Sequence, residues 1–453
     1  MIYYIFYHIL VLNLINAQPL NSELTEDEII RRGFQFDSVS ISITSSRINI
    51  INKDAFKNFK MLKTLNLAYN LIDKIDDEIL NDLSGLDRLV LSGNSIQSLD
   101  NLNLEVLINL NSLDLRDNKI SNITKSMFNI NNKLEKLYLN DNRLKTMNRN
   151  TFKNLIKLKE LYLYDNQIEF IDDVFGNDLQ NSLEILDLES NNLKIINESS
   201  FSNLSALKML ILKNNLITDI QQMAFTDMPS LISIDLESNF IKSIEKSIFT
   251  DTLQILKLGS NSIVIIETNF FENCKNLKQL FLQKNKIRFI DYDAFKYLTN
   301  LEFLDLSRNN IETIESYVFY YLIRLKELYL NYNSIIYVHS GIFRNLRFLL
   351  ELDLSNNKIQ FIEKMEFRFL SDLKILNLKS NSIRNLNVDI FQNLKKITNI
   401  YLKGNKQIAI FFVLFGENIS QLKPLHFLGN PIPSNYEFNF AGLIFLDIAS
   451  IWD

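Results

Sequence analysis

The sequence predicts an α/β-type repeat solenoid, with short parallel strands in a sheet on the concave face and a mostly irregular or short-helical convex side. Three observations predict this fold. The chain has 453 residues, more than the ~250–300 at which a single core stops growing. The pattern L-x-x-L-x-L-x-x-N returns at steps of nearly always 24 residues. About ten residues after each asparagine, a further slot holds Phe in fourteen of sixteen places, and so long a fixed period indicates stacked repeats.

The asparagine slot gives the register of the turns. Two steps are 25 residues and one is 22, and these differences fall in the outer part of a turn. A weakened first turn lies around Ser46, so seventeen turns are expected between residues 38 and 430. The slot is filled by Asn70, Asn94, Asn118, Asn142, Asn166, Asn191, Asn215, Asn239, Asn261, Asn285, Asn309, Asn333, Asn357, Asn381, Asn405 and Asn430.

Each slot has a physical role. In L-x-x-L-x-L the side chains alternate between two faces, so the leucines point inward and the intervening residues point outward. Strands of successive turns then pair in parallel, ~4.8 Å apart. The asparagine amide both donates and accepts, so it can satisfy backbone groups where the chain turns. The phenylalanines are expected to stack in a buried file.

The repeat L-x-x-L-x-L-x-x-N-x-I-x-x-I, with its trailing phenylalanine, resembles the typical 24-residue class of the extracellular leucine-rich repeat family, over roughly residues 38–430. The resemblance implies a horseshoe. It also implies that this chain is a relative of secreted and cell-surface adhesion proteins, matrix components and Toll-type receptor ectodomains of innate immunity. Secreted members of the family often have cysteine-knit caps, whereas this chain has a single cysteine.

The two ends of the chain are therefore expected to be closed without disulfides. Residues 1–17 form an apolar stretch ending in a small residue, which predicts a secretory signal peptide and an extracellular, secreted mature chain without a membrane span. Residues 18–37 are expected to form an N-terminal cap with a short helix, in which Thr25 and Glu28 form a capping box and Gly33 a stop. Residues 431–453 are expected to form a C-terminal cap without cysteines.

Composition argues against several classes of function. The net charge of −5 comes from 48 basic and 53 acidic residues without a long run of either sign, which predicts no nucleic-acid partner and no polybasic membrane patch. After the signal, only His339 and His426 remain, in separate turns. Because an open sheet offers no closed pocket for convergent groups, we expect no enzyme, no cofactor and no metal.

The outward residues of the sheet carry the candidate ligand-binding sites. One cluster is Arg116, Tyr138, Tyr162 and Tyr164, and a second is Phe281, Phe303, Tyr329 and Tyr332. Tyr and Arg are enriched in binding hot spots, and a soluble monomer rarely leaves apolar rings uncovered. The alternative is that tyrosine merely suits a strand.

Other outward or unusual residues have a structural interpretation. Glu189, Lys213 and Glu237 alternate in charge along one column and are expected to form exposed ion pairs. Cys274 occupies an inward slot and is expected to be a small buried residue. Glycosylation sequons occur at Asn122, Asn197 and Asn203, with a less favoured fourth at Asn418.

Two functions follow from the pattern. The first is a binding module that captures a protein or glycoprotein ligand on the concave face, as an adhesion or recognition factor or a soluble receptor-like decoy. The alternative is a structural matrix protein that assembles through its edges or ends. The sequence leaves a homodimer open as a further arrangement.

Overall fold

The computed structural model describes residues 22–100, 102–123, 128, 131–149, 151–245, 248–363, 365–384, 388–391 and 393–405. Two compact units divide between Leu186 and Asp187. The predicted signal peptide, the turn at Asn430, the C-terminal cap and the sequon at Asn418 lie outside the described residues.

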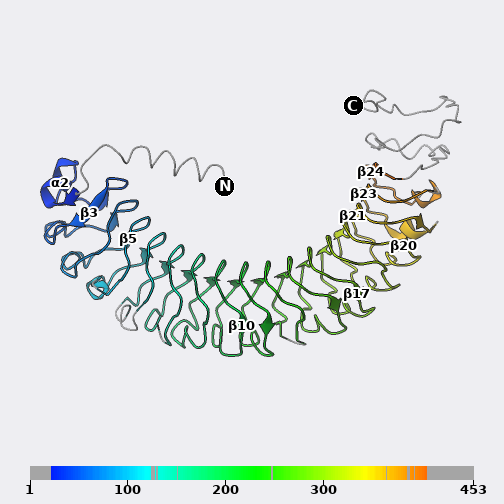
Figure 1. The fold of residues 1–453 in the computed structure, drawn as a ribbon, viewed down its shortest axis with the longest axis horizontal. Coiled ribbons are helices and arrows are strands. Elements are labelled where there is room, and N and C mark those ends of the chain that lie inside the picture. Colours follow the sequence, from blue (N-terminus) through cyan, green and yellow to red (C-terminus); the bar gives the residue numbers. More distant parts are fainter. Residues whose placement is uncertain are drawn as a thin grey trace, which may run out of the picture. The chain divides into compact units, whose positions relative to one another are not determined.

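Among its described residues, the first unit contains one short α-helix, a 3-10 helix and a series of strands of three or four residues (Figure 1). Its elements are β1 (Ser22–Leu24), α2 (Glu26–Arg31), β2 (Ser40–Ser42), β3 (Ile48–Ile51), β4 (Thr64–Asn66), β5 (Arg88–Val90), η2 (Leu104–Val106), β6 (Ser112–Asp114), β7 (Lys136–Tyr138), β8 (Glu160–Tyr162) and the first part of β9 (Ile185–Asp187).

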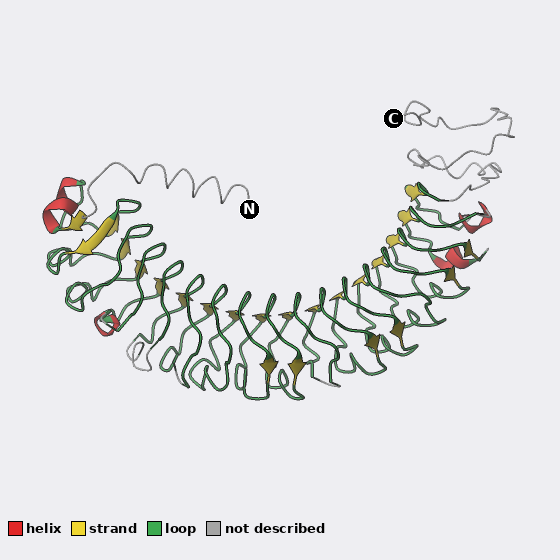
Figure 2. Cartoon of the chain, viewed as in Figure 1, coloured by secondary structure: helices red, strands yellow, loops and turns green. Residues whose placement is uncertain are grey.

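The second unit repeats the same plan and adds two-residue strands on its outer side (Figure 2). Its first elements are β10 (Ile195–Ile196), β11 (Met209–Ile211), β12 (Asp219–Ile220), β13 (Ser233–Asp235), β14 (Ile255–Lys257), β15 (Ile265–Ile266), β16 (Gln279–Phe281), β17 (Phe289–Ile290) and β18 (Phe303–Asp305). They are followed by β19 (Glu327–Tyr329), β20 (Tyr337–Val338), β21 (Glu351–Asp353), β22 (Phe361–Ile362), η3 (Glu366–Phe369), β23 (Ile375–Asn377), η4 (Val388–Phe391) and β24 (Asn399–Tyr401).

Strands of successive turns pair in parallel and in register. Within the second unit, Leu280 pairs with Leu304, and Leu304 with Leu328. Within the first unit, Leu113 pairs with Leu137 in the same way. The predicted fold class is confirmed: the chain forms about 15 turns of a parallel-strand solenoid with little helix. In each unit the strands that pair from turn to turn lie along one side, and the loops, with the two-residue strands of the second unit, lie on the other (Figure 2).

The asparagine slot connects neighbouring turns through its amide. Asn118 Nδ2 donates to the carbonyl of Leu91 in the preceding turn at 3.0 Å and to Leu115 in its own turn at 3.0 Å. Its Oδ1 accepts from the N–H of Ile96 at 3.0 Å. Because these backbone groups are buried, an amide that both donates and accepts is needed at this position.

The phenylalanine slot forms buried stacks behind the sheet. In the first unit the rings of Phe128 and Phe152 are 6.4 Å apart at 22°. In the second unit Phe295 and Phe319 are 6.2 Å apart at 9°. These offset arrangements suit the aromatic quadrupole, and the stacks form the core opposite the strands.

The N-terminal segment covers the first turn with a helix and a strand. At the start of α2 the Thr25 hydroxyl accepts a hydrogen bond from the Glu28 N–H at 3.3 Å, which is one half of the predicted capping box. The Glu28 carboxylate forms ion pairs with Arg31 and Arg32. Strand β1 pairs in parallel with β3, and Leu24 and Ile29 are fully buried. Across the described part of the chain, no helix reaches the length and hydrophobicity of a membrane span.

Candidate ligand-binding face

In each unit, the three-residue strands that pair from one turn to the next, such as β7 and β8 or β16 and β18, form the main sheet. We call the side of this sheet that points away from the core the sheet face. Its residues lie two, four and six positions before each asparagine of the repeat. Because each of these strands is only three residues long, one leucine or isoleucine points inward between two outward side chains. Chemical variation is therefore concentrated on this face, while the inward slots stay constant.

In the first unit, three of the predicted residues form a continuous contact. The rings of Tyr138 and Tyr162 stack with centroids 4.9 Å apart and planes within 1°. The Arg116 guanidinium lies 5.6 Å from the centroid of Tyr138. All three side chains are partly exposed. We call Arg116, Tyr138, Tyr162 and Tyr164 the tyrosine cluster.

Neighbouring charges hold the tyrosine cluster in place. Arg116 forms a 2.9 Å ion pair with the buried carboxylate of Asp114. Burial raises the pKa of Asp114, although Arg116 opposes this shift. The Tyr162 hydroxyl donates to Glu160 at 3.1 Å, and Glu160 pairs with Lys136 at 2.9 Å. The charges around the rings are thus paired within the unit.

Tyr164 lies in the next column of the sheet face and is half-buried. Its carbonyl accepts from the N–H of Asp141 at 2.9 Å. Asp141 and Asp165, at the edge of the cluster, have φ of 53° and 51°, the left-handed conformation that precedes each asparagine of the repeat in the described residues. The fully buried Asn140 has an Oδ1 with no hydrogen-bond partner among the described atoms.

In the second unit, three of the four predicted rings lie together. Phe281 and Phe303 have centroids 4.7 Å apart, and Phe303 and Tyr329 are 5.5 Å apart. We call these three the phenylalanine cluster. Tyr332 is separate: it has φ 55° at the left-handed position, and its ring lies 4.3 Å from the Arg308 guanidinium.

One column of the sheet face in the second unit carries paired polar side chains. Lys213 pairs with Glu189 at 3.1 Å. Glu237 instead accepts from Gln283 Nε2 at 3.1 Å. Gln283 reaches it across Gly259, where an added Cβ would lie 2.5 Å from the glutamine side chain. The glycine therefore leaves the space that this side chain uses.

The aspartates of the sheet face are engaged by their own backbone. Asp235, Asp305 and Asp353 each accept from the N–H two residues later, at 3.0, 2.8 and 2.8 Å. Among the described residues no group of three or more His, Cys, Asp or Glu side chains could hold a metal ion. His339 lies beside Tyr337, with ring centroids 6.1 Å apart, and His426 is outside the described residues.

Cys274 is fully buried in the inward slot where the sequence places it. Burial raises the pKa of its thiol to about 12. Because the thiolate is the reactive species, we expect Cys274 to react with a thiol-specific disulfide reagent only after unfolding. Absorbance of the released thiol measures this, and full labelling of the native protein within minutes would contradict it.

Three sequon asparagines lie in the described loops. Asn122 and Asn203 are exposed, and Asn203 has φ 66°. Asn197 is half-exposed, and its Oδ1 accepts from the N–H of Ser199 at 3.0 Å. Glycosylation at Asn122, Asn197 and Asn203 remains a prediction.

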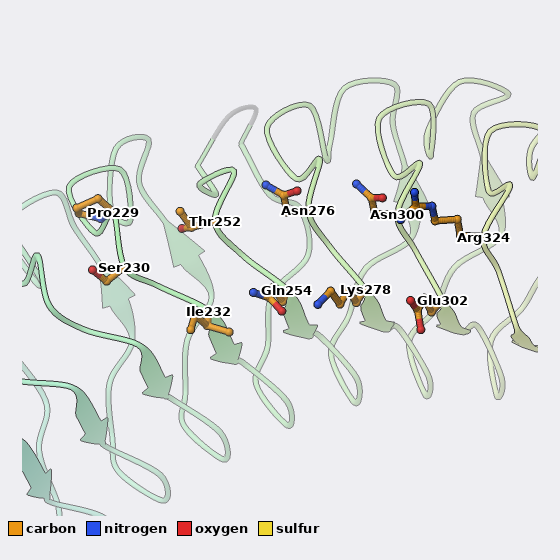
Figure 3. Close-up of a pocket in the computed structure, with 10 residues that line it drawn as sticks. All are labelled: Pro229, Ser230, Ile232, Thr252, Gln254, Asn276, Lys278, Asn300, Glu302 and Arg324. Atoms are coloured by element: carbon orange, nitrogen blue, oxygen red, sulfur yellow. The ribbon is translucent and has the colours of Figure 1, made fainter.

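A shallow groove of about 540 Å³ lies beside the sheet of the second unit. Figure 3 shows Gln254, Lys278 and Glu302 beside the strands and Asn276 nearer the loops. The groove passes over the shortened turn, in which Leu253 follows Phe249 by four positions, whereas the corresponding leucine follows the phenylalanine by six positions in the two neighbouring turns. Sequence reasoning located that deletion but did not predict the groove.

Sequence reasoning also missed two carboxylates beside the phenylalanine cluster. Glu327 and Glu351 lie opposite each other on β19 and β21, in the column of the sheet face next to that of Tyr329. The sequence does contain an indication of this feature. The paired positions on the neighbouring strands, Phe303 and Ile375, are not lysine, whereas in the first unit Lys136 lies beside Glu160.

Seven segments of the chain match the family model described as leucine rich repeat. They are residues 39–105, 108–168, 156–217, 206–252, 251–311, 304–359 and 349–406. The chain belongs to the leucine-rich repeat family. No curated protein sequence gives a significant match.

Several solved structures have this leucine-rich repeat fold. A leucine-rich repeat protein of Leptospira interrogans is 25% identical, covers 87% of this chain and 96% of its own, and has a TM-score of 0.68. Toll from the Drosophila Toll–Spatzle complex is 18% identical over 92% of this chain and 65% of its own, with a TM-score of 0.73. TLR13, solved with ssRNA13, is 24% identical over 87% of this chain and 72% of its own, with a TM-score of 0.61. The last two likenesses show the fold alone.

Proposed function

We propose that this leucine-rich repeat chain is a secreted, non-enzymatic binding module that captures a protein or glycoprotein ligand on its sheet face. It would act as an adhesion or recognition factor, or as a soluble receptor-like decoy. The observation that carries the proposal is the presence of ordered, partly exposed aromatic rows on the face where the repeat allows free choice of residue.

The geometry of the rings supports binding because they are already arranged. Tyr138 and Tyr162 are held by stacking, and Tyr162 also by its hydroxyl bond to Glu160. A ligand that covers such rings loses little side-chain entropy on the protein side. Large, rigid aromatic side chains next to an arginine such as Arg116 are typical of binding hot spots.

The charge pattern supports a protein ligand over a nucleic acid. The chain carries −5 overall, and the described basic side chains of the sheet face are largely paired, as in Lys213–Glu189 and Lys257–Asp235. Phosphate backbones require concentrated positive charge. Toll, solved in complex with Spatzle as a molecular hub in Drosophila development and innate immunity, has the same fold. A role in recognition is therefore proposed here by fold-level analogy.

The tyrosine cluster can be tested by a double substitution. We expect Tyr138→Ala with Tyr162→Ala to reduce the amount of ligand captured from extracellular fluid at least about tenfold, since each hot-spot residue contributes ~2 kcal/mol or more. Capture on immobilised protein followed by quantitative mass spectrometry measures this. The denaturant midpoint should change little, because both rings are partly exposed.

A matched control removes two exposed rings from the loops instead. Phe170 and Tyr292 are 60% and 62% exposed, and Phe170→Ala with Tyr292→Ala should leave capture unchanged. Equal capture by the wild type and the Tyr138/Tyr162 variant would count against this cluster as the binding site. Loss of capture in the loop variant would place binding on the loops.

A further inference from the structure

Building on the proposed binding function, we propose that the phenylalanine cluster takes up a cationic side chain, arginine or lysine, from the protein ligand. The cation would lie against the rings of Phe303 and Tyr329 and pair with the carboxylates of Glu327 and Glu351. This assigns a partner chemistry, a basic segment, to the sheet face of the second unit.

The two carboxylates beside the phenylalanine cluster lack a cationic partner. Several other sheet-face and edge carboxylates lie within 3.1 Å of a lysine. Such pairs are Glu160–Lys136, Glu189–Lys213, Asp235–Lys257 and Glu302–Lys326. Glu327 and Glu351 form no ion pair within the described chain. Their shared neighbour is the Tyr329 hydroxyl, which donates to Glu327 at 3.0 Å.

The electrostatic environment of these carboxylates is unfavourable as a result. Glu327 and Glu351 are partners in the parallel register of β19 and β21, and like charges on adjacent strands repel. Burial, followed by the nearby charge of Glu327, raises the pKa of Glu351. Burial and the charge of Glu351 likewise raise the pKa of the Tyr329 hydroxyl. A cation placed here would reduce the repulsion, and its attraction to the carboxylates would offset the cost of their burial.

An aromatic surface lies beside these carboxylates. Phe281, Phe303 and Tyr329 form a continuous row with centroids 4.7 and 5.5 Å apart, and all three are partly exposed. The negative face of an aromatic ring attracts ammonium and guanidinium groups, more strongly when they are desolvated. A row of rings next to carboxylates without a cation thus complements a basic side chain.

The tyrosine cluster contains the same arrangement with its cation present. Arg116 lies 5.6 Å from the centroid of Tyr138 and pairs with Asp114 at 2.9 Å. The phenylalanine cluster has the ring and the carboxylates but no corresponding arginine or lysine: the outward positions of its three turns hold none. The missing component is therefore a cationic side chain.

Peptide binding tests this inference directly. The probe is a fluorescein-labelled hexa-arginine amide, compared with hexa-citrulline, which has the same shape without the charge. We expect the arginine peptide to bind the full chain in 50 mM NaCl by fluorescence polarisation, and the citrulline peptide to bind at least about tenfold more weakly. Glu327→Gln with Glu351→Gln should weaken arginine-peptide binding at least about tenfold.

A second double variant serves as the control, because it changes the net charge by the same amount at positions away from the phenylalanine cluster. Glu135→Gln with Glu302→Gln removes two edge carboxylates that pair with Lys159 and Lys326, and should change the affinity less than about twofold. Three results would overturn the inference: no binding to the wild type, equal binding of both peptides, or equal loss in the two double variants. If the Tyr138/Tyr162 variant still captures ligand, the proposed function loses support at that cluster. If the Glu327→Gln, Glu351→Gln variant binds the arginine peptide as well as the wild type does, only this inference is overturned, and the proposed function is unaffected.

Discussion

Replacing the asparagine of a central turn, Asn309→Ala, should lower the free energy of unfolding by about 3 kcal/mol, because a buried N–H is left without a partner and several hydrogen bonds are lost. Asn309 is 8% exposed. Its Oδ1 accepts from the N–H of Ile287 at 3.0 Å, and its Nδ2 donates to the carbonyls of Leu282 and Leu306 at 2.9 and 3.0 Å. Denaturant unfolding followed by far-UV circular dichroism measures the change.

The loss falls mainly on one backbone group. The Leu282 carbonyl also accepts from Asn285, and the Leu306 carbonyl also accepts from Asn333, so both keep a donor in the variant. The N–H of Ile287 has no other partner among the described groups. Each turn of a solenoid contacts only its neighbours. The substitution can therefore make unfolding deviate from two-state behaviour in addition to lowering the denaturant midpoint.

The next residue provides a matched control. Asn310 is exposed, and its side chain forms no hydrogen bond within the described chain, so Asn310→Ala should change stability by less than about 0.5 kcal/mol. Asn309→Asp separates the two roles of the amide: the carboxylate still accepts from Ile287 but cannot donate to the carbonyls. Equal stability of the Asn309 and Asn310 alanine variants would show that the asparagine slot does not stabilise the turns.

The scaffold could be predicted from the sequence because its contacts repeat with the period of the chain. Most turns place their leucines, asparagine and phenylalanine in the same surroundings, so one turn predicts the others. Asn118 and Asn309 make equivalent bonds, and Phe128 and Phe319 equivalent stacks. The Tyr138–Tyr162 contact was predictable for the same reason, because equal positions in adjacent turns pair directly.

The remaining features depend on side-chain conformation, which the period does not specify. Gln283 reaches over Gly259 to the turn beyond, so its contact joins residues two turns apart. The sequence pattern predicts that Tyr332 lies with Phe281, Phe303 and Tyr329, but the left-handed backbone before Asn333 directs its ring to Arg308. Such contacts are set by local backbone angles and by the identity of single neighbours.

Glu366 is a further exception to the repeat, because it occupies a slot that is apolar in the three preceding turns. Ala294, Val318 and Ile342 hold that position, immediately before the phenylalanine, and all are buried. Glu366 is 2% exposed, and its carboxylate accepts from the N–H groups of Gly341 at 2.8 Å and Phe343 at 3.2 Å. Burial raises its pKa from 4.5 to about 7, although these two N–H groups act in the opposite direction.

This raised pKa predicts a pH-dependent stability contribution of definite sign. The folded state binds the proton of Glu366 more tightly than the unfolded state, so the favourable contribution is complete below pH 4.5 and is lost as the pH rises to about 7. The loss amounts to about 3 kcal/mol. We expect the difference in unfolding free energy between wild type and Glu366→Gln to fall by this amount from pH 4.5 to pH 8, measured by urea denaturation at each pH.

Taking the difference between the two proteins removes the contribution of carboxylates that titrate identically in both. Glu315→Gln, which removes one exposed carboxylate of the same unit, should give a difference from the wild type that stays constant within about 0.5 kcal/mol over this range. A wild-type advantage over Glu366→Gln that grows with pH would mean that the two N–H groups of Gly341 and Phe343 outweigh burial, and that the carboxylate is held ionised. Because the predicted slope and its opposite have different signs, the measurement decides whether burial or hydrogen bonding dominates at this buried carboxylate.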